Sequence, residues 1–154
     1  MLAKLHTLSL SEETTNSSNC ANGKAIESVD EKIVFKQESF QIIWACFEVY
    51  NAFGSGFLEA VYEEALALEM CDQSIPFQNQ ELLPLQYKTH RLLTQYKPDF
   101  ICYEKIILEI KAVRRLSDEH RSQVHNYLKA TGFKLGLLVN FGQYPKVIYE
   151  RIVR

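Results

Sequence analysis

Apolar residues recur at three- and four-residue spacing in two neighbouring segments, from Lys36 to Phe53 and from Leu58 to about Cys71. This spacing places apolar side chains on one face of a helix, so we predict two helices separated by a break at residues 54–56. The predicted core-facing stripes are Phe40, Ile43, Trp44 and Phe47 in the first helix, and Leu58, Val61, Tyr62, Ala65 and Leu66 in the second.

The pattern after the second helix predicts mainly strands. Residues 77–87 are expected to be extended, with an edge position or a bulge at Pro84 and a turn over residues 88–91. Apolar runs then predict four further strands, over residues 96–102, 106–113, 135–140 and 147–153.

A third helix is predicted between the second and third of these four strands. Ser117 can cap a helix that opens with Asp118 and Glu119 and runs to Thr131, before Gly132. A helix between two apolar strands is suited to a crossover connection. The order of elements therefore predicts a mixed α/β or α+β domain, in which a central mixed sheet is flanked by helices.

Two charges interrupt the apolar run from Ile106 to Val113, namely Glu109 and Lys111. Side chains alternate between the two faces of a strand, so these two share one face. Burying an ion is costly unless a partner charge, a metal or a substrate lies nearby. The pair therefore marks this strand as a candidate site.

A matching carboxylate lies in the preceding strand, at Asp99. If residues 103–105 form the connecting turn, the two strands make an antiparallel hairpin in which Asp99 is opposite Glu109. Opposed residues share a sheet face, so the hairpin would gather Asp99, Glu109 and Lys111. A turn one residue longer or shorter would move Asp99 to the other face.

Two carboxylates on adjacent strands can bind Mg²⁺, whose remaining ligands are often water and phosphate. A lysine beside them could orient an attacking water or stabilise negative charge on the phosphate. The acid-any-lysine spacing is weak by itself, because Asp30-Glu31-Lys32 repeats it in a polar segment. The alternative interpretation of the cluster is a structural network of salt bridges.

Flanking helices offer further polar side chains, one turn apart in each case. Glu59 and Glu63 on the second helix could reach the cluster, as could Gln123 and Tyr127 on the third. Solvated helix surfaces are the alternative explanation for both pairs.

Size and composition limit the remaining choices. The chain has 154 residues, 47% of them hydrophobic, which suits one domain with a sizeable core. We predict a flexible N-terminal extension over residues 1–32 and a folded domain over residues 33–154. No apolar stretch is long enough to span a bilayer, so we expect no membrane partner. The four cysteines are widely spaced and form no C-x-x-C pair, so we expect no zinc site. Free cysteines are typical of the reducing cytoplasm, where we expect the protein to be located.

The net charge of −2 excludes a generally basic nucleic-acid coat, but basic residues gather between Lys111 and Lys134. Six basic residues stand against two acids there. Arg114, Arg115 and Arg121 are the candidate nucleic-acid-binding residues of this stretch. A solvated helix surface would carry the same charges.

Several of these segments resemble one family. Gly56-Phe57-Leu58-Glu59-Ala60-Val61-Tyr62 resembles the signature of the GxxExxY proteins, a group placed in the PD-(D/E)xK nuclease superfamily. Pro98-Asp99 resembles the PD element of the superfamily, and Glu109-Ile110-Lys111 its ExK element. Gln123 to Tyr127 resembles the QxxxY element of the RecB-like branch. The resemblance spans roughly Phe40 to the C-terminus.

The resemblance implies a restriction-endonuclease-like core, Mg²⁺ or Mn²⁺ as cofactor, and DNA or RNA as partner. It implies that Asp99 and Glu109 are metal ligands and that Lys111 is the catalytic lysine. Glu59 would be a supporting catalytic acid, while Gln123 and Tyr127 would support the site. A homodimer is compatible with the sequence.

Three functions follow from the sequence. The first is a metal-dependent nuclease that hydrolyses phosphodiester bonds. The second is a non-catalytic nucleic-acid-binding module that uses residues 111–134. The third is a structural or partner-binding protein in which the charged cluster is only an ion-pair network.

Overall fold

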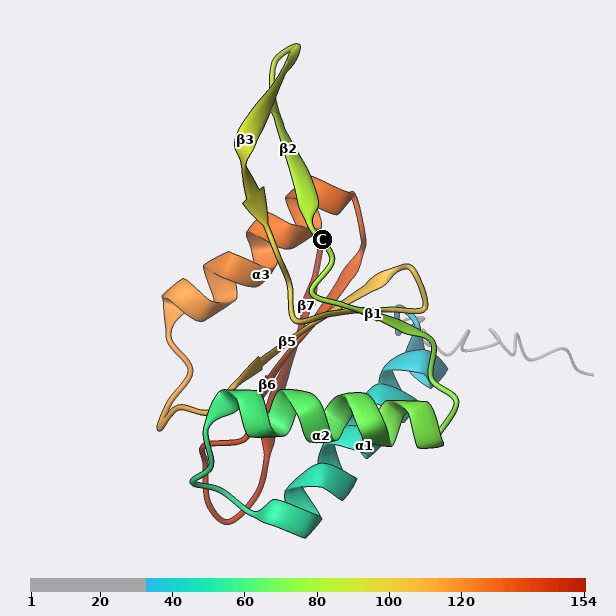
Figure 1. The fold of residues 1–154 in the computed structure, drawn as a ribbon, viewed down its shortest axis with the longest axis vertical. Helices are drawn as coiled ribbons and strands as arrows, with labels where there is room; N and C mark the ends of the chain where they lie inside the picture. Colours follow the sequence, from blue (N-terminus) through green and yellow to red (C-terminus); the bar gives the residue numbers. More distant parts are fainter. Residues whose placement is uncertain (1–32) are drawn as a thin grey trace, which may run out of the picture. The chain divides into compact units, whose positions relative to one another are not determined.

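The computed structural model describes residues 33–154, and the predicted extension over residues 1–32 lies outside them. This part opens with two helices, α1 (Lys36–Phe53) and α2 (Glu59–Asp72), close to the predicted bounds (Figure 1). The elements that follow are β1 (Phe77–Asn79), β2 (Leu83–Tyr87), β3 (His90–Tyr96), β4 (Phe100–Cys102), β5 (Ile106–Lys111), α3 (Asp118–Thr131), β6 (Leu135–Asn140) and β7 (Ile148–Val153).

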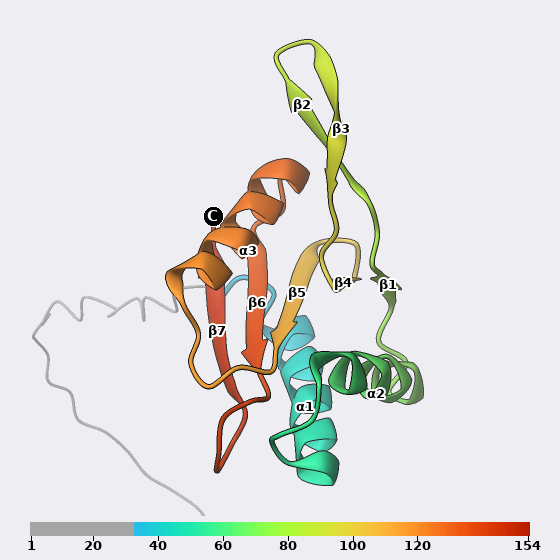
Figure 2. The same ribbon diagram turned by 60° about the vertical axis from the view of Figure 1, so that its left-hand side comes forward.

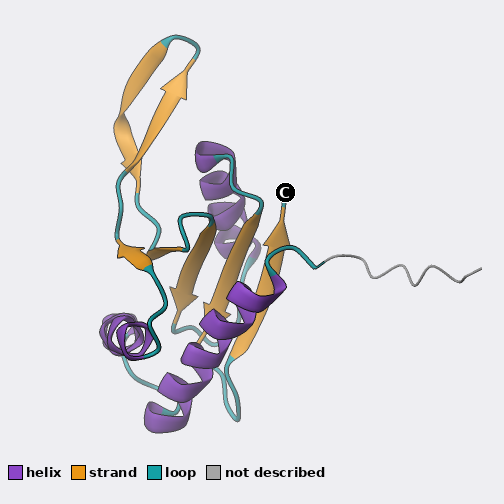
Figure 3. Cartoon of the chain, turned by 90° about the vertical axis from the view of Figure 1, so that its right-hand side faces the viewer, coloured by secondary structure: helices purple, strands orange, loops and turns teal. Residues whose placement is uncertain are grey.

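Five strands form one sheet in the order β1-β4-β5-β6-β7. The neighbours β5 and β6 are parallel and the other pairs are antiparallel, so the sheet is mixed. Helix α3 connects β5 to β6, which confirms the predicted crossover. It covers one face of the sheet, while α1 and α2 cover the other (Figures 2 and 3). The predicted mixed architecture is confirmed.

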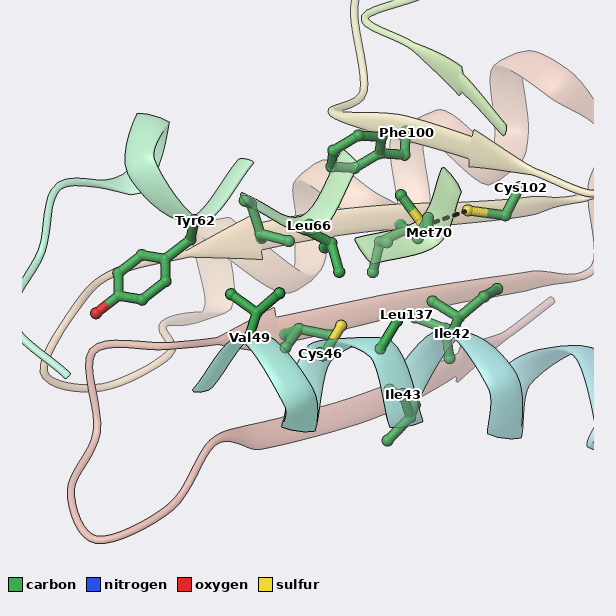
Figure 4. Packing of buried hydrophobic residues seen from close by; sticks show 14 of the residues in the cluster. Ile42, Ile43, Cys46, Val49, Tyr62, Leu66, Met70, Phe100, Cys102 and Leu137 are labelled. Carbon is green, nitrogen blue, oxygen red and sulfur yellow. Dashed lines mark hydrogen bonds between the residues drawn. The ribbon is translucent and has the colours of Figure 1, made fainter. Parts of the chain in front are cut away.

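The core between the sheet and the first two helices is apolar and closely packed (Figure 4). Ile42, Cys46 and Val49 form one row on α1, and they meet Tyr62 and Leu66 of α2. These residues are spaced by three or four positions, so each row lies on one face of its helix. The row on α2 continues to Met70, which the sequence analysis did not include.

Part of the predicted stripe on α1 is wrong. Phe40 is 66% exposed and Trp44 is also exposed, whereas the small residues Ala45 and Cys46 are fully buried. The row through Ile42 and Cys46 turns the two rings away from the sheet. The apolar spacing by itself fits more than one face of α1, and the face that packs against the sheet runs through Ile42, Cys46 and Val49.

Leu58 was also predicted to face the core, and it is 78% exposed. It is the residue that precedes the first turn of α2 and has an extended backbone. Its side chain therefore does not follow the helical face on which Tyr62 and Leu66 lie.

The segment from β2 to β4 differs most from the prediction. The turn contains only Lys88 and Thr89, and the unpredicted strand β3 follows it at once. Strands β2 and β3 form a separate two-stranded sheet with an irregularity after Pro84, as that proline suggested. Strand β4 begins at Phe100, not at residue 96. Pro98 lacks a backbone N–H, which separates β3 from β4.

Membrane-spanning segments are not found among the described helices, because none of them has the required length and apolar character.

Gly136 lies in β6 beneath α3, where an added Cβ would collide with Cγ1 of Val124. Valine is branched at Cβ and has little rotamer freedom in a helix, so the collision would displace α3. We expect Gly136→Ala to lower the free energy of unfolding by about 1–3 kcal/mol, measured by urea denaturation. In the double variant with Val124→Ala, the loss of unfolding free energy should be smaller than the sum of the losses in the two single variants, because the colliding methyl group is gone. Simple additivity would contradict the collision.

Candidate active site

The hairpin of β4 and β5 has the predicted register. Phe100 pairs with Leu108 and Cys102 with Ile106, so one step further Asp99 lies opposite Glu109. The turn uses Tyr103 and Glu104, both with positive φ. Because no residue is added or lost in this turn, Asp99 stays on the same face as Glu109.

Hydrogen bonds hold the two acids against each other's strands. The backbone N–H of Asp99 donates to Oε2 of Glu109 at 3.4 Å. Oδ2 of Asp99 accepts from the backbone N–H of Ile110 at 2.8 Å. Each carboxylate therefore bonds to the opposite strand, which fixes its position at the end of the hairpin.

Lys111 completes the cluster. Its Nζ lies 2.7 Å from Oε1 of Glu109. Glu109 is only 2% exposed. The alternation along β5 puts both side chains on the sheet face that α3 covers, together with Ile107. The three residues that the sequence placed in one cluster are thus brought together.

Glu59 reaches the same place from the first turn of α2. Its Oε2 accepts from the backbone N–H of Ala112 at 3.2 Å, and its Oε1 lies 4.0 Å from Nζ of Lys111. Its side chain remains partly exposed. A carboxylate from the other layer therefore borders the cluster at the end of β5.

The neighbouring residues on α2 have different roles. Glu63 accepts from Nε2 of Gln80 at 2.6 Å, and Oε1 of Gln80 accepts from Nζ of Lys97 at 2.7 Å. Tyr62 is fully buried, stacks on Phe141 and donates its hydroxyl hydrogen to a backbone carbonyl. Tyr62 is a core residue.

Gln123 and Tyr127 approach the site from α3. Nε2 of Gln123 donates to the hydroxyl of Tyr127 at 2.8 Å, and this hydroxyl donates to the carbonyl oxygen of Lys97 at 3.1 Å. Lys97 lies two residues before Asp99. The pair therefore holds the backbone that leads into Asp99, and it contacts the cluster through that backbone.

Asn140 also organises the site, and sequence reasoning did not single it out. It is fully buried at the end of β6, beside Lys111 of β5. Its side chain accepts from the N–H of Val113 at 3.0 Å and donates to the carbonyl of the same residue at 2.8 Å. This contact fixes the chain just after Lys111. An amide at the end of an apolar run was the available signal.

His120 likewise has a structural role that the sequence analysis did not assign. Its Nδ1 accepts from the backbone N–H of Ser117 at 3.1 Å and completes a capping box at the start of α3. The spacing Ser-x-x-His, in which histidine takes the place of the usual glutamate, was the available signal.

The predicted nucleic-acid-binding arginines differ in their surroundings. Arg121 binds both carboxylate oxygens of Glu150, at 2.7 and 2.8 Å, and also contacts Asp118. Arg114 and Arg115 are exposed, and neither forms an ion pair within residues 33–154. The structure therefore gives Arg121 a partner within the fold and leaves the other two guanidinium groups in solvent.

Burial dominates the electrostatics of the cluster. It raises the pKa of Asp99 to about 6 and that of Glu109 to about 7, and repulsion from Asp99 adds to the second effect. Burial also lowers the pKa of Lys111, but Glu109, Glu59 and Asp99 raise it above its ordinary value. A single lysine thus lies beside two closely placed acids. Additional positive charge would stabilise the ionised form of both carboxyl groups.

The donor set fits a hard divalent cation. Asp99 and Glu109 supply carboxylate oxygens, the ligand type that Mg²⁺ and Mn²⁺ prefer, and Mg²⁺ commonly uses only one or two of them. Across residues 33–154 no group of three or more acidic, histidine or cysteine side chains forms a metal site. Any metal held here would need other oxygen ligands, such as water or phosphate.

The raised pKa values of Asp99 and Glu109 predict how the stability of the protein depends on pH when EDTA removes divalent cations. The folded state binds these protons more tightly than the unfolded state, so stability is lost as pH rises from about 4 through 7. Glu109→Gln removes one of the two groups. The free energy of unfolding of the variant, taken relative to that of the unchanged protein, should therefore be higher at pH 8 than at pH 5, by on the order of 3 kcal/mol.

Urea denaturation at both pH values measures this gain. The matched control is Glu104→Gln, which removes an exposed carboxylate from the adjoining turn and should change little with pH. A Glu109→Gln difference that is the same at both pH values would contradict the predicted shift.

Comparison with known proteins agrees with this geometry. The family model described as the PD-(D/E)XK nuclease superfamily matches residues 36–152, and the mixed sheet flanked by helices is consistent with its restriction-endonuclease-like fold. We found no significant match among curated proteins or among solved structures. Since the family match covers nearly all of the described residues, the chain belongs to the PD-(D/E)XK nuclease superfamily.

Proposed function

We propose that this protein is a metal-dependent nuclease that hydrolyses phosphodiester bonds of DNA or RNA at Asp99, Glu109 and Lys111. The observation that carries the proposal is the cluster itself: two opposed carboxylates, the half-buried Asp99 and the buried Glu109, with one lysine at the end of a hairpin. Nucleases of this superfamily generally use divalent metals. We further infer that the chain belongs to the GxxExxY group, from Gly56, Glu59 and Tyr62.

Asp99 and Glu109 would hold Mg²⁺ or Mn²⁺, which supplies Lewis-acid activation of water and of the phosphate when bound. Lys111 would donate hydrogen bonds to the attacking water or to a phosphate oxygen, because its ammonium already lies beside Glu109. The contact between Lys111 and Glu109 limits the motion of the Lys111 ammonium. Its N–H donors would therefore already be in position when water or phosphate binds.

The surrounding residues would keep this geometry. Glu59 lies 4.0 Å from Nζ of Lys111, close enough for an ion pair, which makes it the supporting acid of the site. Gln123 and Tyr127 position the backbone before Asp99, and Asn140 positions the backbone after Lys111. We expect these last three to act as positioning residues.

The unpaired cysteines favour a cytoplasmic location, which we retain as part of the proposal. In the described residues Cys46, Cys71 and Cys102 are free thiols. A homodimer would be compatible with the proposed activity.

Cleavage of short labelled DNA and RNA, single- and double-stranded, tests the proposal. With Mg²⁺ or Mn²⁺ we expect cleavage that EDTA abolishes. Asp99→Asn, Glu109→Gln and Lys111→Ala should each reduce the rate by at least about 100-fold, because each removes a group that acts on the reacting phosphate or water.

The second acid-any-lysine segment of the chain offers a matched control. Lys32→Ala removes a lysine with the same local spacing and should leave cleavage unchanged. Cleavage that survives in EDTA or in Lys111→Ala would contradict the assignment to this site.

A non-catalytic nucleic-acid-binding module is the second candidate, and the exposure of Arg114 and Arg115 favours it. Arg114→Gln with Arg115→Gln should weaken binding and reduce its salt dependence without lowering the melting temperature. Arg121→Gln should lower the melting temperature, because it leaves Glu150 without its partner. Titration of labelled oligonucleotides and thermal unfolding measure the two effects.

The outcomes separate the three functions. Salt-sensitive binding without turnover in either metal would favour the binding module. Absence of both nucleic-acid binding and divalent-ion binding, measured by calorimetry, would favour a structural or partner-binding protein.

A further inference from the structure

Strands β2 and β3 project from the five-stranded sheet as an arm, residues 83–96 (Figures 1 and 2). Most of this arm is exposed, and Leu93 is 100% exposed. An isolated two-stranded hairpin is only marginally stable in water. The arm is anchored at its base, where Leu83 and Tyr96 pack against Val124 and Tyr127 of α3. Its outer half lacks such support.

The arm is cationic. Between Leu83 and Lys97 the chain carries Lys88, Arg91 and Lys97, together with His90, and no acidic residue. This contrasts with the net charge of −2 for the whole chain. Lys88 occupies the turn at the tip, and its Nζ lies 5.4 Å from the ring centre of Tyr87. A tip with an exposed ammonium beside an aromatic ring suits phosphates and bases.

A groove of about 630 Å³ runs between the arm and α3. Its lining is polar and basic on the helix side, through Asn126 and Lys129, and includes Gln86 on the arm side. Its lining residues are Pro84, Leu85, Gln86, Tyr96, Asn126, Lys129 and Ala130.

One lining residue, Tyr96, connects the groove to the candidate active site. Tyr96 lines it and makes an edge contact with Tyr127, with ring centres 5.6 Å apart. The hydroxyl of Tyr127 in turn bonds to the backbone of Lys97, two residues before Asp99. A strand bound in the groove would therefore lie beside Tyr96, one residue contact away from the tyrosine that holds the backbone before Asp99.

We propose that the arm binds the phosphate backbone of the nucleic-acid substrate and holds it against α3, next to the active site. The proposal rests on the proposed nuclease function. Charge decides the occupant: an arm with two cations and no acid complements a polyanion, whereas two such arms from separate copies would repel each other.

Binding of a fluorescent oligonucleotide to the full chain in EDTA tests the proposal across a salt series. Lys88→Gln with Arg91→Gln removes two exposed cations from the arm. Each lost phosphate contact should flatten the logarithmic salt dependence by roughly 0.7–0.9, so we expect a change of about 1.4 to 1.8 for the two contacts. The dissociation constant at low salt should rise roughly ten-fold.

The matched control is Lys36→Gln with Lys146→Gln, which removes two exposed cations that lie outside both the arm and residues 111–134. We expect this variant to keep the salt slope of the unchanged protein. Equal flattening in both variants, or none in the arm variant, would overturn the proposal. A change of oligomeric state in the arm variant, measured by light scattering, would also overturn it and point to a second copy.

Cleavage assays keep this result apart from the proposed function. If the arm variant binds more weakly while the unchanged protein does not cut with either metal, the arm proposal stands and the nuclease proposal fails. If the unchanged protein cuts and the arm variant retains its salt slope, the nuclease proposal stands and the arm proposal fails. With metal, the arm variant should raise KM more than it lowers kcat.

Discussion

Asp99 and Glu109 lie opposite each other at the β4–β5 hairpin, Lys111 forms an ion pair with Glu109, and much of the surrounding structure holds these three residues in place. Two carboxylates out of water repel each other and favour their protonated forms, so their closeness must be imposed by the fold. The hairpin imposes it through backbone hydrogen bonds to both acids. The same burial raises the pKa of both acids, which leaves the cluster suited to additional positive charge.

The sheet separates this chemistry from the main core. Alternation along β5 sends Ile106, Leu108 and Ile110 toward α1 and α2, and sends Glu109 and Lys111 toward α3. The face under α1 and α2 is apolar and carries most of the packing (Figure 4). The other face can therefore hold charged groups without weakening the larger core.

Three elements meet around the end of β5, each with a separate task. The first turn of α2 brings Glu59 to Lys111, α3 brings Tyr127 to the backbone before Asp99, and β6 brings Asn140 to the backbone after Lys111. The parallel pairing of β5 with β6 places Asn140 beside Lys111. The cationic arm joins the same region through Tyr96, which links a surface suited to phosphate with a site suited to its hydrolysis.

The sequence by itself determined the three helices, the crossover and the hairpin register, because all of these depend on local periodicity and on the length of one turn. Asp99 and Glu109 could be paired in this way since a strand has a period of two. The tertiary structure alone decided which face of α1 is buried, because apolar residues lie on more than one face of this helix: Ala45 and Cys46 are buried, whereas Phe40 and Trp44 are exposed. It also decided that Arg121 pairs with Glu150, because these two residues lie far apart along the chain and their spacing carries no local signal. Strand β3 pairs with β2 across a turn of only Lys88 and Thr89, which lacks the Asn-Gly or Asp-Gly signature typical of such turns.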